Sequence, residues 1–378
     1  TPCCRNPKRG LVASLADLTL VIPAYNRPAY LERQIDFWSV TDVHLCILDG
    51  SKESAPQSLI DRMGTNVYYR HVPIGFNERL VMACDLVQTK YVALLGDDEL
   101  YAPHGLKDGI TQLEDDERLI ACVGRTVFFF ERDGAIYGHQ TYEKSQDLEH
   151  TFGNSIDRLH ESLIDITKGP YLLYGIFRTS EWKKAVRVSY GRKYASGYVY
   201  EFAFHLIATL LGPSKMVESL VWMRSGENPA MSSDAVNRKI GTGEWGSDAK
   251  YAAEVSFLID SVVTTVLAEG KHMNHELQNA VSNAVERFVS YSLHKPKRLI
   301  AYWHRLLYFL ARQTPKFVKL LLKKNMTSGL GKVLDYRGVS LAQAVSDMQD
   351  QGIAVDRNEM QGIEAFLLAF HQKKTKGV

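Results

Sequence analysis

Three consecutive carboxylates, Asp97, Asp98 and Glu99, follow a short apolar run and Gly96. A run of this length, closed by glycine, is typical of a buried strand that carries its acids to the end of a sheet. Adjacent carboxylates repel one another, so the group needs either water or a cation, and Mg²⁺ or Mn²⁺ prefers oxygen ligands of this kind. For the triplet taken alone, a solvated acidic turn is the alternative interpretation.

Polar turns also follow the other strands that the N-terminal part predicts. A strand at 19–22 ends at Pro23, one at 43–48 precedes Asp49, and one at 66–71 precedes the turn before Arg79. Helical segments separate these strands, which is the pattern of a wound, mostly parallel sheet. Ligands bind such sheets at the carboxyl ends of the strands. The acids therefore gather where a ligand is expected.

The remaining chain predicts a mixed segment and then helices. The expected segments are a helix at 103–116, a strand at 119–131, a polar insertion or lid at 137–158, a strand-like run at 171–177, helices at 180–188 and 198–211, a strand at 215–223 and a Gly-rich mobile loop at 224–246. Apolar residues at helical spacing continue to the end of the chain. We therefore divide the chain into a leader at 1–16, an α/β domain at 17–246 and an all-helical C-terminal domain at 247–378.

Composition places the chain among ordinary globular proteins. Its 378 residues are 45% hydrophobic and 23% charged, and 45 basic residues against 43 acidic ones give a net charge of +2. This balance gives no global argument for nucleic-acid binding. The five cysteines form no C-x-x-C pair, which indicates reduced core thiols and a cytoplasmic protein. We find neither a signal-peptide pattern nor an apolar run long enough to span a bilayer, so we expect no transmembrane segment.

Four segments in order resemble the nucleotide-sugar-binding half of the family 2 glycosyltransferases. They are Val21-Ile22-Pro23-Ala24-Tyr25-Asn26-Arg27, Leu48-Asp49-Gly50-Ser51, Gly75-Phe76-Asn77-Glu78-Arg79 and Leu95-Gly96-Asp97-Asp98-Glu99. Each is weak alone, but together and in register they are a specific signal. The resemblance implies a GT-A fold and an inverting enzyme of bacterial polysaccharide synthesis. It extends to about residue 230 and does not cover the helical C-terminal part.

The resemblance implies a role for each matching residue. Pro23, Tyr25 and Arg27 line the nucleotide pocket, Asp49 hydrogen-bonds the pyrimidine, and Arg79 supplies a basic group. These roles imply a nucleotide-diphosphate sugar, most naturally a UDP-sugar, as the donor.

The acidic motif departs from the family's Asp-x-Asp spacing. In one alignment Asp97 holds the ribose and Asp98 binds Mn²⁺ or Mg²⁺. In the other, Asp97 and Glu99 form the pair. We prefer Asp98, because Pro103 then keeps its usual distance from the motif, and we include Glu99 as a second metal ligand.

Inversion requires a base for the acceptor hydroxyl, and the resemblance implies an acid in the region of Glu201. A surface acid on a helix is the alternative for this residue. The family often has a histidine in the following loop, but here the loop reads Arg224-Ser225-Gly226-Glu227-Asn228-Pro229. Arg224 or Glu227 is therefore expected to take part in closing the site.

The range 287–325 carries basic residues interleaved with aromatics and has no acid after Arg287. Such a pattern is typical of a helix at an anionic membrane surface. It predicts peripheral attachment at the inner face of the cell membrane and suits a glycan or lipid-linked acceptor. A helical bundle that solvates its lysines is the alternative. Nucleic acid is a weaker candidate, because no recognised motif accompanies the charge.

Two rival functions remain open. A sugar nucleotidyltransferase would want a Gly-rich phosphate loop after the first strand, and residues 24–28 contain no glycine. A non-catalytic nucleotide-sugar-binding protein would place Glu201 far from the acids. The sequence thus favours a metal-dependent, inverting glycosyltransferase.

Overall fold

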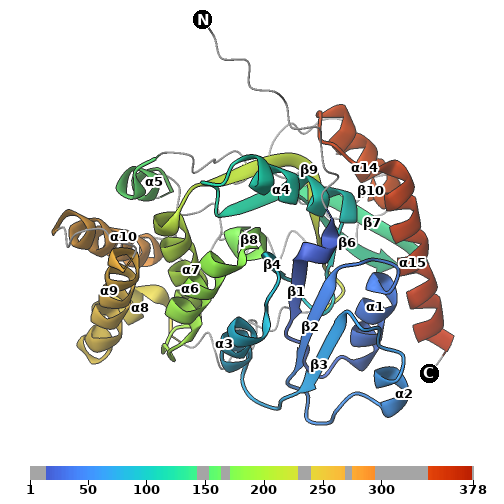
Figure 1. The fold of residues 1–378 in the computed structure, drawn as a ribbon, viewed down its shortest axis with the longest axis horizontal. Coiled ribbons are helices and arrows are strands. Elements are labelled where there is room, and N and C mark those ends of the chain that lie inside the picture. The colour runs from blue at the N-terminus through green and yellow to red at the C-terminus, as the bar shows by residue number, and fades with distance from the viewer. Residues whose placement is uncertain are drawn as a thin grey trace, which may run out of the picture.

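The computed structural model describes residues 14–142, 153–162, 171–228, 240–268, 275–293 and 339–376 (Figure 1). Most of the basic range 287–325, the leader up to residue 13 and part of the 224–246 loop lie outside them. Within the described part, no helix has the length and apolar character needed to cross a membrane.

The N-terminal part is a parallel sheet with helices between its strands. Its elements are η1 (Leu15–Asp17), β1 (Leu18–Ile22), α1 (Pro28–Trp38), β2 (His44–Asp49), α2 (Gln57–Ile60), β3 (Val67–His71), α3 (Phe76–Leu86) and β4 (Tyr91–Leu94). The strands lie in the order β4-β1-β2-β3 and every pair is parallel. This arrangement confirms the winding that the sequence predicts. Leu15 is buried in the core, so the last residues of the predicted leader pack with the sheet.

The sheet continues through antiparallel and parallel pairs to a total of ten strands. The further elements are β5 (Leu100–Tyr101), α4 (Pro103–Asp115), β6 (Ala121–Arg132), β7 (Ala135–Thr141), α5 (Ser155–Ser162), η2 (Tyr171–Tyr174), β8 (Ile176–Arg178), α6 (Thr179–Tyr190), α7 (Tyr198–Leu211) and β9 (Ser214–Ser225). Strand β8 joins β4 to β6, and β9 runs parallel to β6. The sheet is therefore mixed but parallel where the acids emerge.

Strand β7 corrects one expectation. The sequence predicts a polar insertion from residue 137, whereas β7 forms a hairpin with β6 around Asp133 and Gly134. Both turn residues have positive φ, which suits the tight turn. Most side chains of β7 are only half buried, which explains the polar composition of this strand.

Two apolar cores cover the faces of the sheet. Successive residues of β1 alternate between them, because side chains of a strand point to opposite faces. Leu20 belongs to the core under α1 and α4, and Val21 belongs to the core shared with α3, α6 and α7. Cys46, Cys84 and Cys122 are buried free thiols, as the sequence predicts.

The C-terminal part is helical but is not one separate unit. It comprises α8 (Thr242–Ser247), η4 (Ala249–Tyr251), α9 (Ala252–Leu267), α10 (His275–Leu293), β10 (Val339–Ser340), α14 (Leu341–Asp350) and α15 (Arg357–Lys376). Helices α9 and α10 extend the core of α7, on one side of the molecule (Figure 1). On the opposite side, β10 pairs with β7, and α14 and α15 pack on the sheet through a third core.

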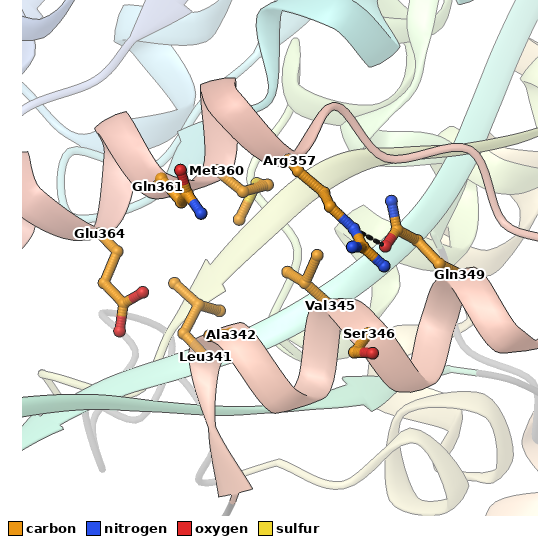
Figure 2. Close-up of a pocket in the computed structure, with 9 residues that line it drawn as sticks. All are labelled: Leu341, Ala342, Val345, Ser346, Gln349, Arg357, Met360, Gln361 and Glu364. Atoms are coloured by element: carbon orange, nitrogen blue, oxygen red, sulfur yellow. Dashed lines mark hydrogen bonds between the residues drawn. The ribbon is translucent and has the colours of Figure 1, made fainter.

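A cavity of about 200 Å³ lies between α14 and α15. Figure 2 shows its apolar floor, formed in part by Leu341, Val345 and Met360, and the hydrogen bond of Arg357 to Gln349 at its edge. The lining residues all belong to these two helices. The cavity is therefore separate from the acids that follow β4.

Candidate active site

The acidic loop after β4 meets the turn after β1. The backbone N–H of Tyr25 donates to Asp97 Oδ2 over 3.2 Å, and Arg27 Nη1 donates to Asp97 Oδ1 over 2.8 Å. The same Arg27 nitrogen lies 3.3 Å from Asp98 Oδ2. Burial works to raise the pKa of Asp97, and Arg27 opposes it, but the net pKa is raised. The structure thus joins three of the predicted nucleotide and metal residues: Arg27, Asp97 and Asp98.

Helix α1 holds the backbone of this loop. The fully buried Gln34 donates from Nε2 to the carbonyl oxygens of Asp97 and Glu99, over 3.1 and 2.6 Å. Its Oε1 accepts from Trp38 Nε1. From the preceding residue, Arg33 Nη2 donates to the Asp98 carbonyl oxygen. These contacts fix the direction in which the acids point, because the carbonyls between them cannot rotate without losing buried partners.

The loop after β9 reaches the same acids. Asn228 Nδ2 donates to Asp98 Oδ2 over 3.0 Å, and Glu227 Oε2 accepts from Arg33 Nη1 over 2.8 Å. The other Glu227 oxygen is hydrogen-bonded to Nε2 of His371 on α15. Glu227 is thus connected to the acidic loop through Arg33, and the expectation that Arg224 or Glu227 takes part in closing the site stays a prediction.

At the end of β2, Asp49 is buried and both of its oxygens have partners. Oδ1 accepts from the Ser51 backbone N–H over 2.9 Å, and Oδ2 accepts from the Tyr69 hydroxyl over 2.9 Å. Asn26 and Ser51 join the two turns, since the Asn26 N–H donates to Ser51 Oγ over 2.7 Å. Asn26 has a φ of 53°, in the left-handed region that asparagine tolerates.

Arg79 lies beneath these turns and has an exposed fraction of only 1%. Its Nη1 donates to the carbonyl oxygens of Ala24 and Leu48, at the ends of β1 and β2. A Cβ at Gly50 would come within 2.6 Å of its guanidinium carbon, so glycine is needed there. The described contacts of Arg79 are thus with backbone, and its predicted role toward a nucleotide stays a prediction.

Tyr25 is the exposed member of this group. Its exposed fraction is 42%, and its ring lies 6.0 Å from the Arg79 guanidinium. Pro23 is buried directly after β1. An exposed ring above a buried cation leaves the outer face of Tyr25 available for stacking on a flat group.

Glu99 lies on the side of the loop that faces β9. Its Oε2 accepts from Trp222 Nε1 over 3.0 Å. Burial, with a smaller effect of Asp98, raises the pKa of Glu99 to about 8. The Trp222 ring stacks with Tyr174 at 4.1 Å and with Tyr142 at 5.8 Å. Arg224 Nη1 donates to the Tyr142 hydroxyl, so Arg224 belongs to this aromatic group.

Glu201 lies in the first turn of α7 and is half buried. Burial raises the pKa of the Tyr142 and Tyr174 hydroxyls, and the charges of Glu99 and Glu201 raise it further. Both carboxylates therefore lie within electrostatic range of the same two tyrosines. The role of Glu201 as the base, with a surface acid on a helix as the alternative, stays a prediction.

The residues fit a divalent cation at Asp98. Among the described residues, no three His, Cys, Asp or Glu side chains form a ready-made metal cluster. The Asp98 side chain is 13% exposed, against 2% for Asp97. One reachable carboxylate is sufficient for Mg²⁺ or Mn²⁺ when a diphosphate and water supply the other oxygens. Glu99 is bound to Trp222, and its assignment as a metal ligand stays a prediction.

Sequence reasoning missed several residues of this site. Gln34, Arg33 and His371 carry no local motif, because each acts on a loop that is distant in the chain. Trp222 lies in the strand predicted at 215–223, and nothing in that pattern indicates its contact with Glu99. Asn228 lies in the loop at 224–229, where the sequence analysis gives a role only to Arg224 or Glu227.

Comparison with known protein families gives one match. Residues 19–174 match the model of the family described as glycosyl transferase family 2. No curated protein matches the chain by sequence.

Among solved structures, S. aureus TarS 1–349 has 12% identity and a TM-score of 0.47, and the match covers 80% of this chain and 82% of that one. The same fragment with UDP-GlcNAc has 12% identity, a TM-score of 0.45 and coverages of 80% and 83%. With UDP it has 11% identity, a TM-score of 0.45 and coverages of 88% and 91%.

The matched range contains β1 to β4, the acidic loop and the turns that surround it. A mixed sheet that is parallel from β1 to β4, with flanking helices and acids at the strand ends, is the GT-A-like arrangement that the resemblance implies. Residues 19–174 therefore match glycosyl transferase family 2, and the described part of the chain combines a GT-A-like sheet with a helical C-terminal region.

Proposed function

We propose that this protein transfers a sugar from a nucleotide-diphosphate sugar, a UDP-sugar, to a hydroxyl of a glycan or lipid-linked acceptor, with inversion at the anomeric carbon. The observation that carries the proposal is the meeting of Arg27, Asp97 and Asp98, where the turn after β1 contacts the loop after β4.

The donor would lie across the carboxyl ends of β1, β2 and β4. Tyr25 offers an exposed ring for the base, and Asp49 is held beside it by Ser51 and Tyr69. Asp97 faces the turn after β1 and suits a ribose hydroxyl. Arg27 provides a positive charge at the position expected for the diphosphate.

Asp98 would hold Mn²⁺ or Mg²⁺. Such a cation supplies neutralisation of the charge that develops on the departing diphosphate. The protein's own contribution is to aim the Asp98 carboxylate, which Asn228 and Arg27 contact and whose backbone carbonyl Arg33 holds.

Glu201 is the proposed base. In a single in-line displacement its carboxylate takes the proton of the acceptor hydroxyl while that oxygen bonds to the anomeric carbon. The bond from the anomeric carbon to the diphosphate oxygen breaks, and the electron pair leaves with the nucleoside diphosphate. Because attack and departure take place on opposite faces, the anomeric configuration inverts.

Glu99 and Glu201 both lie within electrostatic range of Tyr142 and Tyr174. Glu99, held by Trp222 and with its raised pKa, suits a structural role at neutral pH better than proton transfer. The half-buried Glu201 is therefore the better acid to meet an acceptor.

Attachment to the cytoplasmic face of an anionic membrane remains part of the proposal. It rests on the basic and aromatic pattern of residues 287–325, most of which lie outside the described residues. A lipid-linked acceptor would be reached most easily from such a surface.

A thermal-shift screen tests the proposed donor. We expect UDP-sugars with Mn²⁺ to raise the melting temperature, and GDP-sugars or Mn²⁺ alone to have a smaller effect. The absence of a shift with every nucleotide sugar would count against the function. A shift with UDP together with no transfer to any acceptor would favour the non-catalytic binding protein.

A further inference from the structure

A buried chain of side chains links the last helix to the acidic loop. His371 Nε2 is hydrogen-bonded to Glu227 Oε1, and Arg33 Nη1 donates to Glu227 Oε2. Arg33 Nη2 then donates to the carbonyl oxygen of Asp98. The side chains of Arg33, Glu227 and His371 are 0%, 4% and 15% exposed. The chain therefore runs through the interior, from α15 through α1 to the predicted metal ligand.

Glu227 governs the contacts of Asp98 at two points. Arg33 holds the Asp98 backbone, and Asn228, the next residue after Glu227, donates to the Asp98 side chain over 3.0 Å. A shift of Glu227 would therefore move one partner directly and the other through the backbone. Both main chain and carboxylate of Asp98 depend on where Glu227 lies.

His371 is the partner of Glu227 Oε1, whereas Glu227 Oε2 accepts from Arg33 and, over 3.4 Å, from the Ser225 hydroxyl. Burial alone would raise the pKa of Glu227, but the hydrogen bonds from His371 and Arg33 outweigh it, so that the pKa is lowered. An ionised carboxylate accepts only, so His371 Nε2 must carry the proton in this contact. Without His371, one carboxylate oxygen would lose its partner inside the protein, which is costly.

We propose that His371 is a positioning residue for the acidic loop, and that it acts through Glu227 and Arg33 to hold Asp98 in the direction needed for metal and diphosphate. His371, on the distant helix α15, thus contacts the loop after β9. This inference rests on the proposed function, because one of its two tests measures the binding of UDP with Mn²⁺.

The remaining contacts of α15 make the test practicable. Phe370 packs on Tyr30 at 5.2 Å, Phe366 packs on Phe37 at 5.3 Å, and Lys373 forms an exposed ion pair with Glu32. These contacts do not involve the His371 ring, so α15 is expected to stay docked when that ring is removed.

Two variants at position 371 and one control separate positioning from docking. His371→Ala removes the donor, and His371→Gln keeps an N–H donor that can reach Glu227. Lys373→Ala breaks an ion pair between the same two helices without touching the buried chain. Glu227→Gln, which preserves side-chain size, gives a second route to the same loop if His371→Ala fails to fold.

The first readout is hydrogen exchange of the Leu95–Glu99 amides in the protein without ligand. We expect exchange about tenfold faster in His371→Ala and in Glu227→Gln, with His371→Gln and Lys373→Ala close to the original protein. Unchanged exchange in His371→Ala, or an equal increase in Lys373→Ala, would overturn the proposal.

The second readout is the affinity for UDP with Mn²⁺, measured by calorimetry. We expect about tenfold weaker binding in His371→Ala and near-normal binding in His371→Gln. Normal affinity in a folded His371→Ala would overturn the positioning role. If the original protein itself binds no UDP, the proposed function fails, and the exchange measurement alone then decides the role of His371.

Discussion

Trp222 Nε1 donates to Glu99 Oε2 over 3.0 Å, and this contact joins the acidic loop after β4 to strand β9. The acceptor is a buried carboxyl whose pKa is raised to about 8, chiefly by burial. Its folded pKa therefore lies above its value of about 4.5 in the unfolded chain.

This contact predicts a pH-dependent stability. Because the pKa of Glu99 is higher in the folded protein, its contribution to stability is fully present below about pH 4.5. This contribution is lost as the pH rises toward about 8, since in that range the unfolded chain holds fewer protons than the folded one. In chelator, the free energy of unfolding should fall by up to about 1.4 kcal/mol per pH unit through this window. Glu99→Gln should lack this component. Parallel profiles of the two proteins in denaturant titrations would contradict the assignment.

Replacing Gln34 should lower the free energy of unfolding. Gln34→Leu leaves the buried carbonyl oxygens of Asp97 and Glu99 without their side-chain donor, and Trp38 Nε1 without its acceptor. We expect a loss of about 3 kcal/mol in unfolding free energy, measured with urea. Gln57→Leu is the control, because Gln57 bonds only to the exposed Asp61 among the described hydrogen bonds. Equal stability of the two variants would show that Gln34 does not support the loop.

Replacing Glu201 should affect sugar transfer without affecting donor binding. Glu201→Gln keeps the size of the side chain but cannot take a proton, so donor binding should stay within about twofold and transfer should fall by about 100-fold or more. Glu244→Gln, in the first turn of α8, changes an exposed acid of the same kind and should remain active. An active Glu201→Gln enzyme would remove Glu201 as the base.

The basic range 287–325 predicts binding to anionic vesicles. Sedimentation with vesicles that contain an anionic lipid should capture the protein at low salt and release it as salt rises, because the attraction is screened. Vesicles of neutral lipid are the control and should capture little. If anionic vesicles capture none at low salt, the bundle of packed, solvated helices is the better interpretation.

Local patterns were sufficient to predict the parallel sheet and the loop that carries the acids. The apolar runs of β1, β2 and β4 are short and end in glycine, proline or acid, and these signals lie within a few residues of each strand. The meeting of Arg27 with Asp97 follows from the adjacency of β1 and β4. The order of the strands therefore brings together residues that the sequence indicates only in separate motifs.

Long-range contacts carried no such signal. Arg33 and Gln34 read as ordinary polar positions of a helix, yet both are buried against the acidic loop. His371 lies 144 residues beyond Glu227, and the division at residue 247 placed them in different domains. The short strand β10 and the packing of α14 and α15 on the sheet depend on the same kind of distant contact.

Calorimetry of UDP with Mn²⁺ tests the central assignment most directly. Asp98→Ala is compared with the original protein and with Asp85→Ala, which changes an exposed acid on α3. We predict that the original protein and Asp85→Ala bind UDP more tightly when Mn²⁺ is present, and that Asp98→Ala loses this dependence on the metal. Unchanged, metal-dependent affinity in Asp98→Ala would contradict the account.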